Sequence, residues 1–128
     1  MKTARRLRNT VCGGFGALCL VATAPAMPSA GRYEGRLCVA TSNAAPDCGP
    51  ADVVLQPGGL ASVRISDIEY RLQLRGGATV DVVLMHGTMQ IDGFSAPYAW
   101  QGSALQFSDD EKHVRYEVRV GDRKPAGR

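Results

Sequence analysis

The sequence predicts an all-β protein: a small antiparallel up-and-down barrel or sandwich of about eight short strands, preceded by a signal peptide. Three observations predict this class. Stretches of the chain alternate apolar and polar residues with a period of two, and glycine- or proline-containing turns separate them at short intervals. Residues 1–30 have the composition of an export leader.

The leader has the three parts of a secretory signal. The basic residues Lys2, Arg5, Arg6 and Arg8 come first, and the small, apolar stretch 11–22 follows. Small residues then allow cleavage near Ala26 or Ala30. The apolar run of about twelve residues is shorter than the roughly twenty that span a bilayer, so we expect no stable membrane span after cleavage. The sequence therefore predicts a periplasmic or secreted protein.

The basic character of the chain belongs to this leader. The whole sequence has 15 basic and 12 acidic residues, and the leader holds four of the basic ones and no acidic one. Removing those four leaves 11 basic against 12 acidic residues. A nearly neutral domain has no long-range field to attract phosphates, so we expect no nucleic-acid partner.

The cysteines divide in the same way. Cys12 and Cys19 belong to the leader, and Cys38 and Cys48 remain as an even pair. In an exported chain such a pair is expected to form a disulfide. The alternatives are a metal pair and a redox pair, but the spacing fits no metal-ligand pattern and C-x-x-C is absent.

Two strands are predicted clearly by alternation. In 68–75 the apolar residues Ile68, Tyr70, Leu72 and Leu74 share one face, and in 113–120 Val114, Tyr116, Val118 and Val120 do so. Weaker strands are expected over 33–41, 52–56, 60–65, 79–85, 88–94, 98–101 and 104–108. We expect a loop over 42–50 and a strand break at Ser95-Ala96-Pro97. Residues 31–121 then form a single β domain, and 122–128 a flexible tail.

The candidate binding surface is an apolar patch of Val83, Met85, Tyr98 and Trp100. The stretch 79–85 is apolar on both faces, which indicates either a strand covered on both sides or an exposed contact patch. Tyr98 and Trp100 share a face of a short strand, where they either bind a partner or close the end of a barrel.

The string Met85-His86-Gly87-Thr88-Met89 offers two thioethers and an imidazole, a ligand set suited to Cu(I). Strand methionines more commonly fill a core, and we expect no metal or cofactor. A hydrolase would need a base such as His86 or His113 beside a nucleophile, but no G-x-S-x-G elbow occurs. We therefore expect no catalytic residues.

Arginines alternate with glutamates on the polar faces of the two clear strands. One strand carries Glu69, Arg71 and Arg75, and the other carries Arg115, Glu117 and Arg119. If the two strands are neighbours, these residues form a cross-strand charge ladder. The alternative is a guanidinium-rich patch that binds a carboxylate or a phosphate.

These observations predict a non-catalytic exported domain that binds a protein or a component of the cell envelope. The alternatives are a structural or assembly subunit of the envelope and, third, a small metal-binding or hydrolytic protein centred on His86. The sequence leaves open the partner's identity, the strand order, the oligomeric state and the choice between periplasm and exterior.

Overall fold

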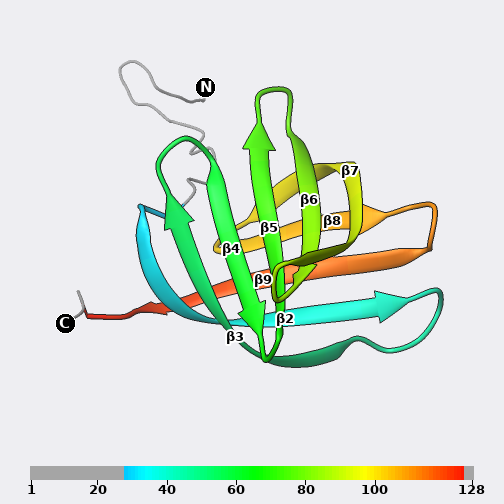
Figure 1. Cartoon of the computed structure of the whole chain (residues 1–128), viewed down its shortest axis with the longest axis horizontal. Helices are drawn as coiled ribbons and strands as arrows, with labels where there is room; N and C mark the ends of the chain where they lie inside the picture. Colours follow the sequence, from blue (N-terminus) through cyan, green and yellow to red (C-terminus); the bar gives the residue numbers. More distant parts are fainter. Residues whose placement is uncertain (1–27, 126–128) are drawn as a thin grey trace, which may run out of the picture.

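The computed structural model describes residues 28–125, and within them the chain forms eight antiparallel strands closed into a barrel (Figure 1). The strands are β2 (Gly31–Thr41), β3 (Asp47–Gln56), β4 (Leu60–Ile65), β5 (Ile68–Arg75), β6 (Thr79–His86), β7 (Met89–Gln101), β8 (Ala104–Asp109) and β9 (Val114–Arg123). Each strand pairs with the next, and β9 pairs with β2 to close the ring. The predicted all-β fold is confirmed, as a barrel. Residues 1–27 of the predicted leader lie outside the described residues.

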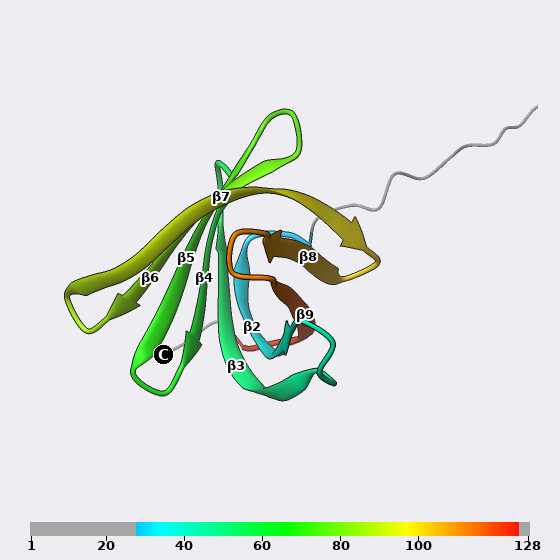
Figure 2. The ribbon, with the colours of Figure 1, turned by 90° about the vertical axis from the view of Figure 1, so that its right-hand side faces the viewer.

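The barrel is flattened into two walls whose strands cross. Figure 1 shows β4, β5 and β6 running steeply across the direction of β2, β8 and β9. Strand β7 bends from one wall to the other and arches over the molecule in Figure 2. Its residues from Met89 to Pro97 pair with β6, whereas only Tyr98–Gln101 pair with β8. This bend determines where the barrel wall opens.

Alternation places the apolar residues inside, as predicted for 68–75 and for 114–120. Leu72 and Leu74 of β5 and Val118 and Val120 of β9 all belong to one buried core. The largest fully buried side chains are Leu72, Val53, Val63, Val80 and Val82. Removing this apolar surface from water is the main favourable term in the stability of the fold.

One expected interruption is shorter than predicted, and a second is absent. Strand β3 begins at Asp47, inside the predicted loop 42–50, because it pairs with β2 as far as Val39. Strand β7 runs through the predicted break at Ser95-Ala96-Pro97. Pro97 is the partner of Thr79 and has no partner on β8. A proline lacks an N–H group, so a strand tolerates it where a neighbouring strand asks for no donor.

The chain stays ordered beyond the predicted domain boundary at residue 121. Strand β9 continues to Arg123, and the Lys124 N–H donates to the Arg32 carbonyl at 2.7 Å. The Lys124 ammonium donates to Asp52 Oδ1 at 2.6 Å. Residues 122–124 of the predicted tail are therefore held against β2 and β3, and 126–128 lie outside the described residues.

The predicted disulfide is present. Cys38 and Cys48 are register partners on β2 and β3, with their Cα atoms 4.0 Å apart and their sulfur atoms bonded. The bond lies on the outer side of the wall, because the neighbouring Leu37 belongs to the core inside. Within residues 28–125 there is no helix with the length and apolarity needed to cross a membrane.

Candidate binding groove

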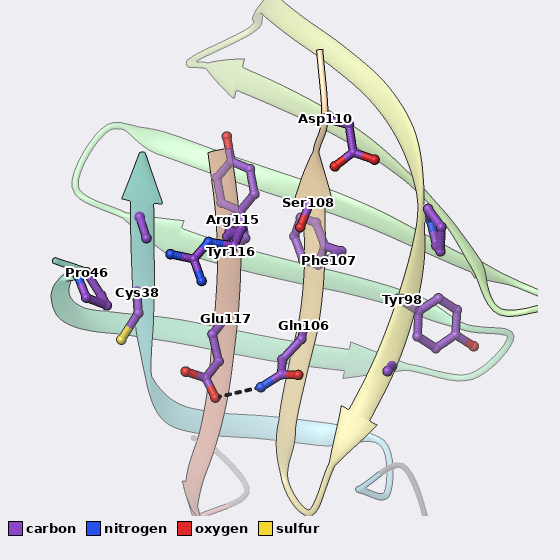
Figure 3. A pocket seen from close by; sticks show the side chains of 13 residues that line it. Cys38, Pro46, Tyr98, Gln106, Phe107, Ser108, Asp110, Arg115, Tyr116 and Glu117 are labelled. Carbon is purple, nitrogen blue, oxygen red and sulfur yellow. Dashed lines mark hydrogen bonds between the residues drawn. The ribbon is translucent and has the colours of Figure 1, made fainter. Parts of the chain in front are cut away.

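A groove of about 480 Å³ runs along the outer face of β2, β9 and β8 (Figure 3). Pro46, from the loop between β2 and β3, lies at one side beside Cys38, and Tyr98 of β7 lies at the other. Side chains of β8 and β9 lie between them. The lining residues are Cys38, Ala40, Pro46, Pro97, Tyr98, Ala99, Gln106, Phe107, Ser108, Asp110, Arg115, Tyr116 and Glu117.

The groove owes its β7 side to a seam in the barrel wall. We use this name for the gap between Met89–Pro97 of β7 and the last residues of β8, which are not paired with each other. Aromatic rings fill the seam from inside: Phe94 lies 6.2 Å from Phe107 and 5.8 Å from Tyr116, between ring centroids. The Lys112 ammonium bonds the Asp92 carboxylate and so joins the β8–β9 turn to β7. Side-chain contacts therefore hold the seam together where backbone hydrogen bonds between β7 and β8 are missing.

Glu117 organises the polar centre of the groove. Its Oε2 accepts from the Gln106 amide at 3.3 Å, a bond drawn in Figure 3. Its Oε1 accepts from Arg119 Nη2 at 3.2 Å. Both carboxylate oxygens are therefore engaged, and Gln106 is held across β8 and β9. The Glu117 carboxylate and the Gln106 amide are therefore held in place by each other and by Arg119 before any ligand binds.

Arg115 is the cation of the groove that has no such partner. Its strand position is opposite Ser108 on β8 and Ala40 on β2. Among residues 28–125, no ion pair or side-chain hydrogen bond of its guanidinium is present. A guanidinium presents its donors in a rigid fork that matches a carboxylate or phosphate. Arg115 and the Ser108 hydroxyl therefore offer donors that the fold itself does not use.

The sequence-predicted patch is not brought together as one surface. Tyr98 and Trp100 both pack against the core, as the partners of Phe107 and Leu105, and of the two only Tyr98 also lines the groove. Val83 lies half-buried on β6, between Arg71 and Gly93 of the neighbouring strands. Met85 is 9 % exposed. Of the four residues, only Tyr98 belongs to the groove.

The charge ladder expected between 68–75 and 113–120 does not form, because β5 and β9 are not neighbours in the barrel. Glu69 instead pairs with Arg64 at 3.6 Å and with Arg71 at 3.4 Å. In the sequence, Arg115 is one arginine of that ladder or of the alternative guanidinium-rich patch. Its place beside Pro46 and Ser108 depends on closure of β9 against β2, which no local pattern reports.

The five-residue string around His86 is divided between surfaces. His86 and Met89 are cross-strand partners at the β6–β7 turn, but Met85 is buried and pairs with Gln90. His86 Nε2 lies 3.8 Å from Asp67 Oδ2. In the part of the chain that the structure describes, no three His, Cys, Asp or Glu side chains are grouped as a metal ion would require.

Comparison with known proteins finds no matching family model, no matching curated protein and no matching solved structure. The assignment of a function therefore rests on the geometry and chemistry of this groove.

Proposed function

We propose that the protein is an exported, non-catalytic binding domain that holds a segment of a protein or of a cell-envelope component in the groove between Pro46 and Tyr98. The observation that carries this proposal is Arg115: a guanidinium without a partner among the described residues, opposite Ser108, in a groove with apolar sides. Donors that the fold does not use are available to a ligand.

The volume and lining of the groove suit a small molecule or a short segment of a chain. About 480 Å³ lies within the range of pockets that bind small molecules or short segments. Pro46, Pro97 and Tyr98 supply apolar contact, and Gln106 and Ser108 supply polar groups between them. An extended segment with a carboxylate facing Arg115 would satisfy both parts. Such a pair gains strength from geometry, because a guanidinium binds a carboxylate with two parallel hydrogen bonds.

A disulfide restrains one wall of the groove, and a restrained wall reduces the entropic cost of binding. The Cys38–Cys48 bond ties β2 to β3 behind Pro46, and Cys38 and Ala40 are buried. A disulfide also fits the oxidising compartment that the leader predicts, the periplasm or the exterior.

An assembly role in the envelope is the second candidate, and the seam favours it. The β8-facing edge of β7 has no partner strand over Met89–Pro97. Two apolar side chains lie exposed there, Met89 at 65 % and Ile91 at 50 %. An unpaired strand edge with apolar side chains is the feature that another chain uses when it adds a strand to a sheet.

The groove is tested by blocking it. Ser108→Trp would place a large ring in the groove, and Arg115→Ala would remove the free guanidinium. The matched controls are Gln56→Trp and Arg32→Ala, which change exposed residues outside the groove. The exported protein and each variant are used to capture material from envelope extract, and every captured species is quantified by mass spectrometry.

The proposal expects one species whose recovery falls about tenfold or more in Ser108→Trp, falls in Arg115→Ala and is unchanged in both controls. A species recovered equally by all variants would contradict the groove. Light scattering distinguishes the assembly role from the binding role. An assembling subunit should form larger particles as its concentration rises, and the groove variants should not change the size of those particles.

A further inference from the structure

A second hollow of about 370 Å³ lies at the end of the barrel where the β2–β3 and β4–β5 hairpins turn. We call it the mouth. Its inner surface is apolar and comes from β2, β4 and β5: Leu37, Val39, Ile65, Ile68 and Tyr70. Asp47 and Ser66 also line it, at the turn ends of β3 and β4. Figure 2 views the molecule from the side toward which the β2–β3 and β8–β9 hairpins point.

Two phenol groups lie at this end of the core without hydrogen-bond partners among residues 28–125. Tyr70 lines the mouth, and the Tyr116 ring packs edge-on against it, with ring centroids 5.7 Å apart. Tyr116 is only 9 % exposed. In Figure 3 its hydroxyl points toward the end of the barrel where Asp110 lies. Tyr70 therefore adds an aromatic ring to the wall of the mouth, whereas Tyr116 belongs to the lining of the groove.

The end of the barrel around the mouth carries more carboxylates than cations. Its turns and strand ends hold the cations Arg64, Lys112 and Arg115 and seven carboxylates: Asp47, Asp67, Glu69, Asp92, Asp109, Asp110 and Glu111. Lys112 is already engaged by Asp92, with Asp109 Oδ2 at 4.0 Å. Asp47 forms no ion pair with any residue of 28–125. At the opposite end cations and carboxylates are more nearly balanced, and Lys124 and Arg75 there pair with Asp52 and Asp81.

We propose that the mouth binds a small amphiphile with a cationic head group, its alkyl tail among Leu37, Val39 and Ile65 and its head beside Asp47. This site is separate from the groove and does not depend on the proposed function. The apolar lining favours burial of the tail. An anionic head would meet like charges, and a neutral head would gain only the burial of the tail.

Calorimetry with three probes that share a ten-carbon tail tests this ligand class: decyltrimethylammonium, decyl sulfate and decyl maltoside, each below its micellar concentration. The exported protein should bind the ammonium at one site and at least tenfold more tightly than the other two. Raising the salt concentration should weaken that binding, since the carboxylates lie at the surface.

Variants locate the site. Val39→Phe fills the mouth and should abolish binding, whereas Val54→Phe, on the neighbouring strand outside the mouth, should leave it unchanged. Asp47→Asn should lower the affinity for decyltrimethylammonium about two- to fivefold, as expected for an exposed charge pair. Asp52→Asn should leave that affinity unchanged. If Val39→Phe does not fold, methyl NMR of the wild-type protein locates the site instead. The chemical-shift changes on addition of decyltrimethylammonium should then centre on Ile65 and Ile68.

Equal binding of all three probes, binding of none, or shifts centred away from the mouth would each overturn the proposal. None of these outcomes would affect the groove, because capture through Arg115 and Ser108 is measured without an amphiphile.

Discussion

Phe94 of β7 and Tyr116 of β9 stack across the seam, with ring centroids 5.8 Å apart and planes 21° from parallel. Tyr116 also stacks on Phe107 of β8 at 5.1 Å. The Phe94 ring, which also lies 6.2 Å from Phe107, connects the part of β7 that is unpaired with β8 to β8 and β9, whereas Phe107 and Tyr116 are register partners of each other. The seam is therefore held by aromatic packing and by the Lys112–Asp92 ion pair.

Replacing Phe94 should loosen the seam selectively. We expect Phe94→Ala to cost about 2–3 kcal/mol of unfolding free energy, somewhat below the cost for a fully buried ring. Hydrogen exchange at Ser108 and Asp109 should accelerate more than exchange in β4, which has paired neighbours on both sides. Phe94→Leu serves as a control that keeps most of the apolar volume. Uniform acceleration across all strands would show that the seam is no weaker than the rest of the wall.

The disulfide should contribute measurably to stability. It closes a loop with a sequence separation of 10 residues, for which the chain-entropy treatment gives about 2.5–3 kcal/mol. The double variant Cys38→Ala, Cys48→Ala should lower the urea midpoint by a corresponding amount and keep the circular dichroism of a β-protein. A reductant should lower the wild-type midpoint and leave that of the double variant unchanged. Free thiols at both positions in the exported protein would contradict the bond.

Glu69 should make the protein sensitive to acid. A hydrogen bond from the Ser62 hydroxyl at 2.7 Å, helped by Arg71 and Arg64, lowers the pKa of this carboxyl below its ordinary value of 4.5. A lowered pKa adds stability that is present above 4.5 and lost as the pH falls through the folded-state value.

The variant Glu69→Gln should therefore lose less unfolding free energy than the wild type between neutral pH and about pH 3. Ser62→Ala should reproduce most of that change, because it removes the largest cause of the shift. Chemical denaturation at a series of pH values measures both. If wild type and Glu69→Gln showed the same acid dependence, the hydrogen bond would not act on the charge as described.

Tyr116 should make the protein sensitive to alkali. Burial, and then the negative charges of Tyr70, Asp109 and Asp92, raise the pKa of Tyr116 from 10.0 to about 12. A raised pKa gives stability that is complete below pH 10 and lost as the pH rises toward 12. In a spectrophotometric titration, Tyr116→Phe should remove the last phenol to ionise. An unchanged final step in that variant would contradict the burial of this hydroxyl.

The sequence predicts the strands well where one face of the strand is buried and the other is exposed to solvent. The boundaries of β4 and β5 match the predicted 60–65 and 68–75, because alternation and turn residues are local signals. The strand break predicted at Pro97 is absent, because a proline is tolerated at a seam where no N–H group is needed. Val83 and Met85 belong to a strand apolar on both faces, for which alternation cannot decide which side is inside.

The groove could not be predicted from the sequence for a different reason. Arg115 is near the C-terminal end of the chain, whereas Pro46 and Cys38 are near its beginning. They become neighbours only because β9 closes against β2, a contact between distant segments that leaves no periodic trace. The aromatic ring of Tyr98 indicates a contact residue, but the bend of β7 that places it at the groove is a tertiary feature.

The central claim is that a partner occupies the groove beside Arg115, and site-specific photocrosslinking in the exporting cell tests it most directly. A photoreactive residue at Gln106, inside the groove, is compared with one at Gln56, an exposed position outside it. We predict a discrete crosslinked species from position 106 that is absent from position 56 and that Arg115→Ala weakens. Crosslinks of equal yield at both positions, or a species from position 106 that Arg115→Ala leaves unchanged, would contradict the claim.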